Sequence, residues 1–95
     1  MNTEAVVEWH WPGALARFAE GHVALRVPAA DLAQAMDRLV ERFPDLKDVL
    51  LDRTGSLRGH LALLCDSRIE SWENLRHRPI GEPIKVELLF VAGGG

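Results

Sequence analysis

The sequence predicts an α+β domain in which one long helix packs on one face of a mixed β-sheet of about four to five strands. Two segments of alternating apolar residues come first, a single amphipathic helix pattern follows, and further alternating segments close the chain. The 95 residues suit one domain with a single core. We expect this domain to span residues 1–92, and residues 93–95 to form a flexible glycine tail.

The first two strands are predicted at residues 5–11 and 22–27, joined as a hairpin. Pro12 and Gly13 end the first strand. The alternation predicts a buried face made of Val7, Trp9 and Trp11 in the first strand and Val23, Leu25 and Val27 in the second.

One long helix is predicted after the second strand. Asp31 is a suitable N-cap, and Gln34 stands three residues later as its capping-box partner. Pro44 ends the pattern. The apolar stripe that should face the sheet consists of Leu32, Met36, Leu39, Val40 and Phe43.

The C-terminal half is predicted to complete the sheet. A helical turn at residues 45–51 and a loop at residues 52–60 come first. The remaining elements are a strand at 61–65, a turn at Asp66–Ser67, a short strand or return at 68–72, and a last strand at 85–92. In the last strand the alternation places Val86 and Leu88 on one face and Leu89 and Val91 on the other.

Composition and charge argue against several classes of function. The net charge of −3 offers no basic field for a nucleic acid. The acidic N-terminus lacks the pattern of a signal peptide or membrane span, so we expect a cytoplasmic protein without a membrane partner. Cys65 is the single cysteine, which suits a reducing compartment, and its inward parity predicts a small apolar core residue.

No catalytic or metal site is predicted. The four histidines show no short metal-binding spacing, and no nucleophile stands with a base and an orienting group at a recognised spacing. We therefore expect no metal, no bound cofactor and no catalytic residue.

Three stretches together resemble the ubiquitin-like β-grasp sulfur carriers. They are "WPGALARFAEGHVALRV" at 11–27, the segment from Leu32 to Ser71, and the glycines at the end. The family includes the small subunit of molybdopterin synthase and the carriers of the thiamin and cysteine pathways. Two features depart from the family pattern: Pro83 lies just before the last strand, and a third glycine extends the usual diglycine end.

The alternation of the last strand bears on which glycine is the functional end. With Gly94–Gly95 as the diglycine, Val86 and Leu88 face the core. The alternative, Gly93–Gly94, would bury Lys85 and Glu87, and burial of a lone charge is costly. We therefore expect Gly95 to be the functional residue, preceded by the tail residues Gly93 and Gly94.

The resemblance implies a carrier that serves as a co-substrate. An activating enzyme of the ubiquitin-activating type would use ATP to adenylate the Gly95 carboxylate, and a sulfur donor would convert it to a thiocarboxylate. A biosynthetic enzyme that makes molybdenum cofactor, cysteine or a thio-metabolite would accept the sulfur, and the chain could be the small subunit of a molybdopterin-synthase-like enzyme. The residues expected to meet these partners are the apolar ones on the face without a helix: Leu89 first, then Leu64, with Val91 beside them.

Two alternatives from other classes remain open. The chain could be a ubiquitin-like modifier that is conjugated to lysines, or a β-grasp interaction module whose glycine end has no chemistry. An isopeptide bond to a target lysine would indicate the modifier. Partner binding that survives removal of the tail would indicate the interaction module.

Overall fold

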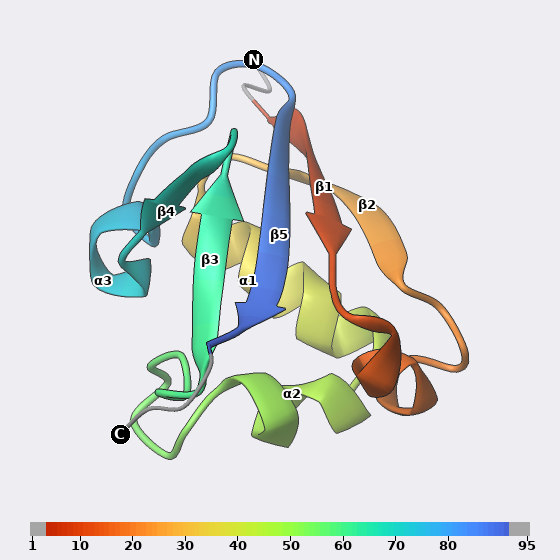
Figure 1. Ribbon diagram of the computed structural model, residues 1–95. Helices are drawn as coiled ribbons and strands as arrows, with labels where there is room; N and C mark the ends of the chain where they lie inside the picture. The colour runs from red at the N-terminus through yellow and green to blue at the C-terminus, as the bar shows by residue number, and fades with distance from the viewer. Residues whose placement is uncertain (1–3, 92–95) are drawn as a thin grey trace.

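The computed structural model describes residues 4–91 (Figure 1). The strands are β1 (Ala5–His10), β2 (Ala24–Ala29), β3 (Leu61–Cys65), β4 (Arg68–Glu70) and β5 (Ile84–Phe90). The helices are α1 (Leu32–Arg42), α2 (Asp45–Leu50) and α3 (Trp72–Leu75), and a 3-10 helix, η1, spans Gly13–Phe18. Within residues 4–91, no helix is both long enough and apolar enough to cross a membrane.

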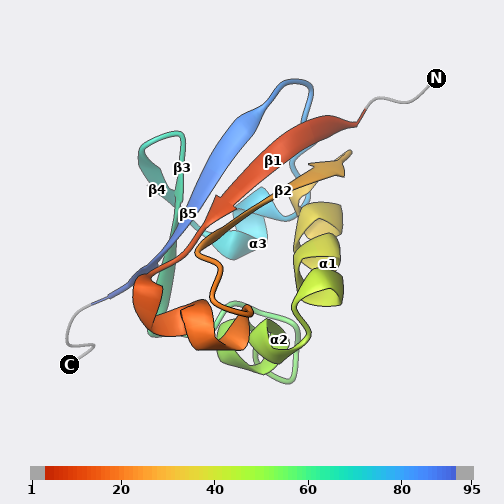
Figure 2. The ribbon, with the colours of Figure 1, turned by 90° about the vertical axis from the view of Figure 1, so that its right-hand side faces the viewer.

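The five strands form one mixed sheet in the order β2-β1-β5-β3-β4. The central pair, β1 and β5, runs parallel, and the other neighbours run antiparallel. Figure 2 shows the sheet edge-on, with α1, α2 and α3 on one side and no helix over the other. The predicted α+β class, with a helix on one face of a mixed sheet, is confirmed. We call the uncovered side the open face.

The first hairpin forms as predicted, with Trp9 opposite Leu25. Trp9 is fully buried, and its indole N–H donates to the Ala35 carbonyl at 3.2 Å, which ties β1 to α1. The prediction that Val23 faces inward is wrong, because its side chain is 47% exposed. Residues 22 and 23 precede β2, and their carbonyls accept from the Trp11 indole and the Trp11 backbone N–H. The inward positions of β2 are Leu25, which is partly buried against the core as predicted, and the buried Val27 and Ala29.

Helix α1 begins at the predicted cap. Asp31 Oδ1 accepts from the Gln34 backbone N–H at 2.8 Å, and Gln34 Oε1 accepts from the Ala30 N–H at 2.7 Å. The predicted stripe packs on the sheet, except that Val40 is only half-buried at its margin. Its fully buried members include Leu32 and Leu39.

The C-terminal half follows the predicted order with one difference. Asp66 and Ser67 adopt positive φ values of 48° and 71°, which is typical of the tight hairpin turn between β3 and β4. Strand β4 is only three residues long, and Trp72 begins α3 instead of continuing a strand. The physical reason is burial: Trp72 is only 7% exposed, and the turn of α3 directs its ring into the core.

Candidate functional site

Successive side chains of β5 alternate between the core and the open face. Val86 and Leu88 are 0% and 1% exposed, whereas Leu89 is 38% exposed. The predicted inward pair is therefore confirmed. Gly93, Gly94 and Gly95 lie outside the described residues, so the choice of Gly95 as the functional end stays a prediction.

An apolar patch occupies the open face over β3, β4 and β5. Leu89 and Val91 are 38% and 46% exposed. Leu64 is half-buried and lies diagonally from Leu89, because the register pairs Leu64 with Glu87 and Ala62 with Leu89. All three residues predicted to meet a partner thus lie on the open face or at its margin. We define the apolar patch as Leu64, Ile69, Leu89 and Val91.

Ile69 is the member of the apolar patch that sequence reasoning missed. It is 73% exposed and lies directly opposite Leu64 in the β3–β4 pair. The signal was present in the turn at Asp66–Ser67, because a two-residue turn pairs Cys65 with Arg68 and therefore Leu64 with Ile69.

The chain leaves β5 from a defined position. The Val91 N–H donates to the His60 carbonyl at 3.0 Å, which holds the end of β5 against the start of β3. The ring of His60 stacks on Phe90, with the ring centroids 6.1 Å apart and an angle of 16° between the planes. The backbone just before the last four residues is thus anchored beside the apolar patch.

Charged side chains cover the open face over β1, β2 and the first part of β5. Glu8 contacts His10 Nε2 at 3.1 Å and Arg26 Nε at 3.4 Å, and Lys85 Nζ lies 2.9 Å from Glu87. The hydrogen bond from His10 holds the pKa of the Glu8 carboxyl below its ordinary value, and the bond to Glu87 raises the pKa of Lys85. These charges neutralise one another, so this part of the face carries no field of one sign.

The described residues offer no cluster suited to metal binding, and the one cysteine among them is buried. Within residues 4–91, no three His, Cys, Asp or Glu side chains gather closely enough to hold a metal ion. Cys65 is buried, and burial raises the pKa of its thiol, so the reactive thiolate is disfavoured. What the geometry offers is an apolar docking surface beside an anchored chain end.

Comparison with solved structures finds proteins with this architecture. SAMP1 from Haloferax volcanii is 25% identical, with a TM-score of 0.75 over 95% of this chain and 99% of that one. Small archaeal modifier protein 1 from Methanosarcina acetivorans is 17% identical, with a TM-score of 0.79 over 99% of this chain and 100% of that one. A chain of the BexX/CysO complex from Amycolatopsis orientalis is 15% identical, with a TM-score of 0.74 over 94% of this chain and 99% of that one.

These neighbours are ubiquitin-like β-grasp proteins, so the predicted fold is confirmed. No protein-family model matches the sequence, and neither does any of the curated proteins with which it was compared. The likeness is therefore to small carrier and modifier proteins, and it lies in the three-dimensional structure.

Proposed function

We propose that this chain is a sulfur carrier whose C-terminal Gly95 is converted to a thiocarboxylate. The observation that supports this best is a β-grasp fold whose last strand ends beside an exposed apolar patch and continues in the sequence into three glycines. The structural likeness to SAMP1 and to a chain of the BexX/CysO complex supports the same general kind of protein.

The chemistry requires a partner enzyme, because the chain is the co-substrate. The Gly95 carboxylate attacks the α-phosphorus of ATP and releases pyrophosphate, which leaves an acyl-adenylate. Sulfide then attacks the carbonyl carbon and expels AMP, which forms the thiocarboxylate. A persulfide donor would instead leave an acyl disulfide, and a second thiol would have to attack the donor's sulfur, form a disulfide with it and release the thiocarboxylate. ATP is used by the partner and is not a resident cofactor of this chain. The sulfur passes next to a biosynthetic enzyme that makes molybdenum cofactor, cysteine or a thio-metabolite.

Two features of the chain serve this transfer. The apolar patch, which includes Leu89, docks on the activating enzyme, because burying exposed apolar side chains drives association. The four residues after Val91 can extend about 13 Å from the docked domain, far enough to enter a recessed active site. Glycines suit that passage because they have no Cβ to block a narrow channel.

Mass spectrometry tests the proposal directly. Incubation with an activating enzyme, ATP and sulfide should add the mass that corresponds to replacing one oxygen of Gly95 by sulfur. Removal of Gly94 and Gly95, or the substitution Gly94→Val, should abolish the addition. Gly81→Val is the matched control, because a Cβ at Gly81 meets no atom within 4 Å, and Gly81 precedes β5 whereas the glycine tail follows it in the sequence. A mass shift that survives removal of both glycines would refute the assignment.

Docking is tested by a pair of surface variants. Leu89→Glu should weaken binding to the activating enzyme, because it replaces an apolar side chain of the patch by a charge. Val23→Glu is the control. Val23 is 47% exposed, and it directly precedes β2, the strand at the other edge of the sheet. Equal binding by the two variants would show that the apolar patch is not the docking surface.

A second candidate function is a ubiquitin-like protein modifier. Two of the structural neighbours are small archaeal modifier proteins, which favours this alternative. The same adenylated Gly95 would then form an isopeptide bond with a lysine of a target protein. Covalent adducts of higher mass on target proteins, without a thiocarboxylate on the free chain, would support the modifier. If neither product forms, the third reading applies, a β-grasp interaction module.

A further inference from the structure

A groove of about 370 Å³ opens at the edge of the sheet, where β4 stops short of its neighbour β3. Strand β4 pairs only with Leu63, Leu64 and Cys65, and the chain then leaves the sheet to form α3. Leu61 and Ala62 therefore have β5 on one side and the groove on the other. The opposite walls are the loop at 56–59 and the segment from Ile69 to Glu73.

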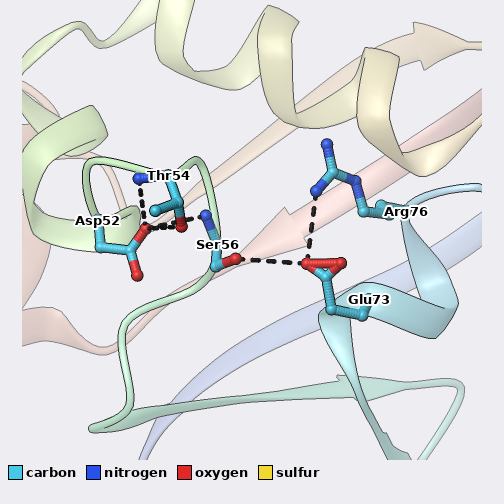
Figure 3. A network of polar contacts seen from close by, with 5 residues as sticks. All are labelled: Asp52, Thr54, Ser56, Glu73 and Arg76. Carbon is cyan, nitrogen blue, oxygen red and sulfur yellow. Dashed lines mark hydrogen bonds and ion pairs between the residues drawn. The ribbon is translucent and has the colours of Figure 1, made fainter.

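Polar contacts join the two walls of this edge groove (Figure 3). Asp52 Oδ1 accepts from the backbone N–H groups of Thr54 and Ser56 at 2.8 and 3.1 Å, which shapes the loop. The Ser56 hydroxyl donates to Glu73 Oε1 on α3 at 3.3 Å, and Arg76 Nη1 lies 3.4 Å from the same oxygen. The edge groove is therefore formed before any ligand arrives, which lowers the entropic cost of binding.

A residue of the edge groove has an unused hydrogen-bond donor. Trp72 lines the groove and is only 7% exposed, and its indole Nε1, which is itself buried, has no acceptor within residues 4–91. The indoles of Trp9 and Trp11 both donate to backbone carbonyls, at 3.2 and 2.8 Å. Because buried donors nearly always have a partner, an acceptor supplied at the groove would satisfy the Trp72 indole.

The backbone of β3 offers a complementary acceptor. The Val91 N–H donates to the His60 carbonyl, and the Asp66 N–H donates to the Lys85 carbonyl. The backbone N–H and C=O groups of the even-numbered residues of β3 therefore point toward β5. Because these backbone directions alternate along a strand, the N–H and C=O of Leu61 point to the side of the edge groove. Its N–H is bonded to the Arg58 carbonyl at 3.0 Å, and its own carbonyl is directed to the side where β4 has ended.

We propose that the edge groove binds an extended segment of a partner protein that carries apolar side chains. A peptide backbone can supply a carbonyl for the Trp72 indole and an N–H for the Leu61 carbonyl. Leu57 and the exposed Ile69 provide an apolar wall for its side chains. This binding requires neither Gly95 nor its activation, so it can be tested independently of sulfur transfer.

The test is a titration of the ¹⁵N-labelled chain with the peptide acetyl-Thr-Val-Thr-Val-Thr-amide, followed by NMR. The Trp72 indole signal, identified by its loss in Trp72→Phe, should shift in a saturable way, while the Trp9 and Trp11 indole signals stay in place. Methylation of the peptide's backbone nitrogens should weaken binding by about tenfold or more, because the bond to Leu61 is lost. An unmoved Trp72 signal at millimolar peptide would overturn the proposal.

Variants and other occupants complete the experiment. Ile69→Ser should weaken peptide binding, and Val23→Ser, at the far edge of the sheet, should leave it unchanged. A chain that ends at Val91 should show the same Trp72 signal as the full chain before any peptide is added. If truncation moves that signal, residues 92–95 are the occupant, and if dilution moves it, a second copy is. Either result would overturn the assignment to a partner's segment.

Discussion

Replacing Leu88 and Leu89 one at a time by alanine tests which face of β5 packs on the core. Leu88 is 1% exposed, and truncation of so deeply buried a leucine costs about 2–5 kcal/mol, since it loses burial and leaves a cavity. Leu89 is 38% exposed and has no helix above it, so its truncation leaves no closed cavity. We expect Leu89→Ala to cost at most about 1.5 kcal/mol, because the three carbons removed are only partly buried.

Urea denaturation measures both variants. Leu88→Ala should lower the midpoint by about 1 M or more, a large effect for a domain whose total stability is of the order of 5–15 kcal/mol. The slope of the transition should stay the same in both variants, which shows that only the free energy of unfolding has changed. A cost for Leu89→Ala equal to or greater than that for Leu88→Ala would show that the core face and the open face of β5 are assigned the wrong way round. The apolar patch would then no longer be a docking surface.

Three further predictions concern the helix cap, the buried thiol and the open-face ion pair. Asp31→Ala removes the side-chain cap of α1 and should cost about 0.5–2 kcal/mol in thermal unfolding; a cost no greater than that of Asp37→Ala, at an exposed position in the same helix, would contradict it. Because burial raises the pKa of Cys65, the native thiol should react with a thiol reagent only slowly at neutral pH and rapidly after unfolding. Fast native reaction would place it outside the core. The pKa of Glu8 lies below its ordinary 4.5, so its ionised form adds stability above pH 4.5 that is lost as the pH falls through the lowered value. His10→Ala should raise that pKa in an NMR titration, and an unchanged value would rule out the His10 contact.

Local patterns predicted most of the scaffold. The cap at Asp31 and the stripe that contains Leu39 were readable because a helix brings residues three and four apart onto one face. The inward side of β5 was readable for a similar reason, since successive side chains in a strand point to opposite faces. The exposure of Leu89 and Val91 followed from the same alternation.

Other features depended on contacts between distant parts of the chain. Val23 continues the alternation of β2 in sequence, yet its side chain is 47% exposed, at a point where the His22 and Val23 carbonyls accept from Trp11. Trp72 follows a short strand pattern, yet it begins a helix because its ring is buried in the core. In both places a tertiary contact outweighed the local preference.

The sequence by itself determined the order of the strands and of α1, the faces of α1 and β5, and the glycine-rich end, because each is written in the spacing of neighbouring residues. Only the tertiary structure decided that β1 and β5 pair in parallel, that Ile69 joins the apolar patch, and that β4 ends early enough to leave a groove beside Trp72. Such features depend on which surfaces can be buried together, and that choice is made by packing across the whole domain.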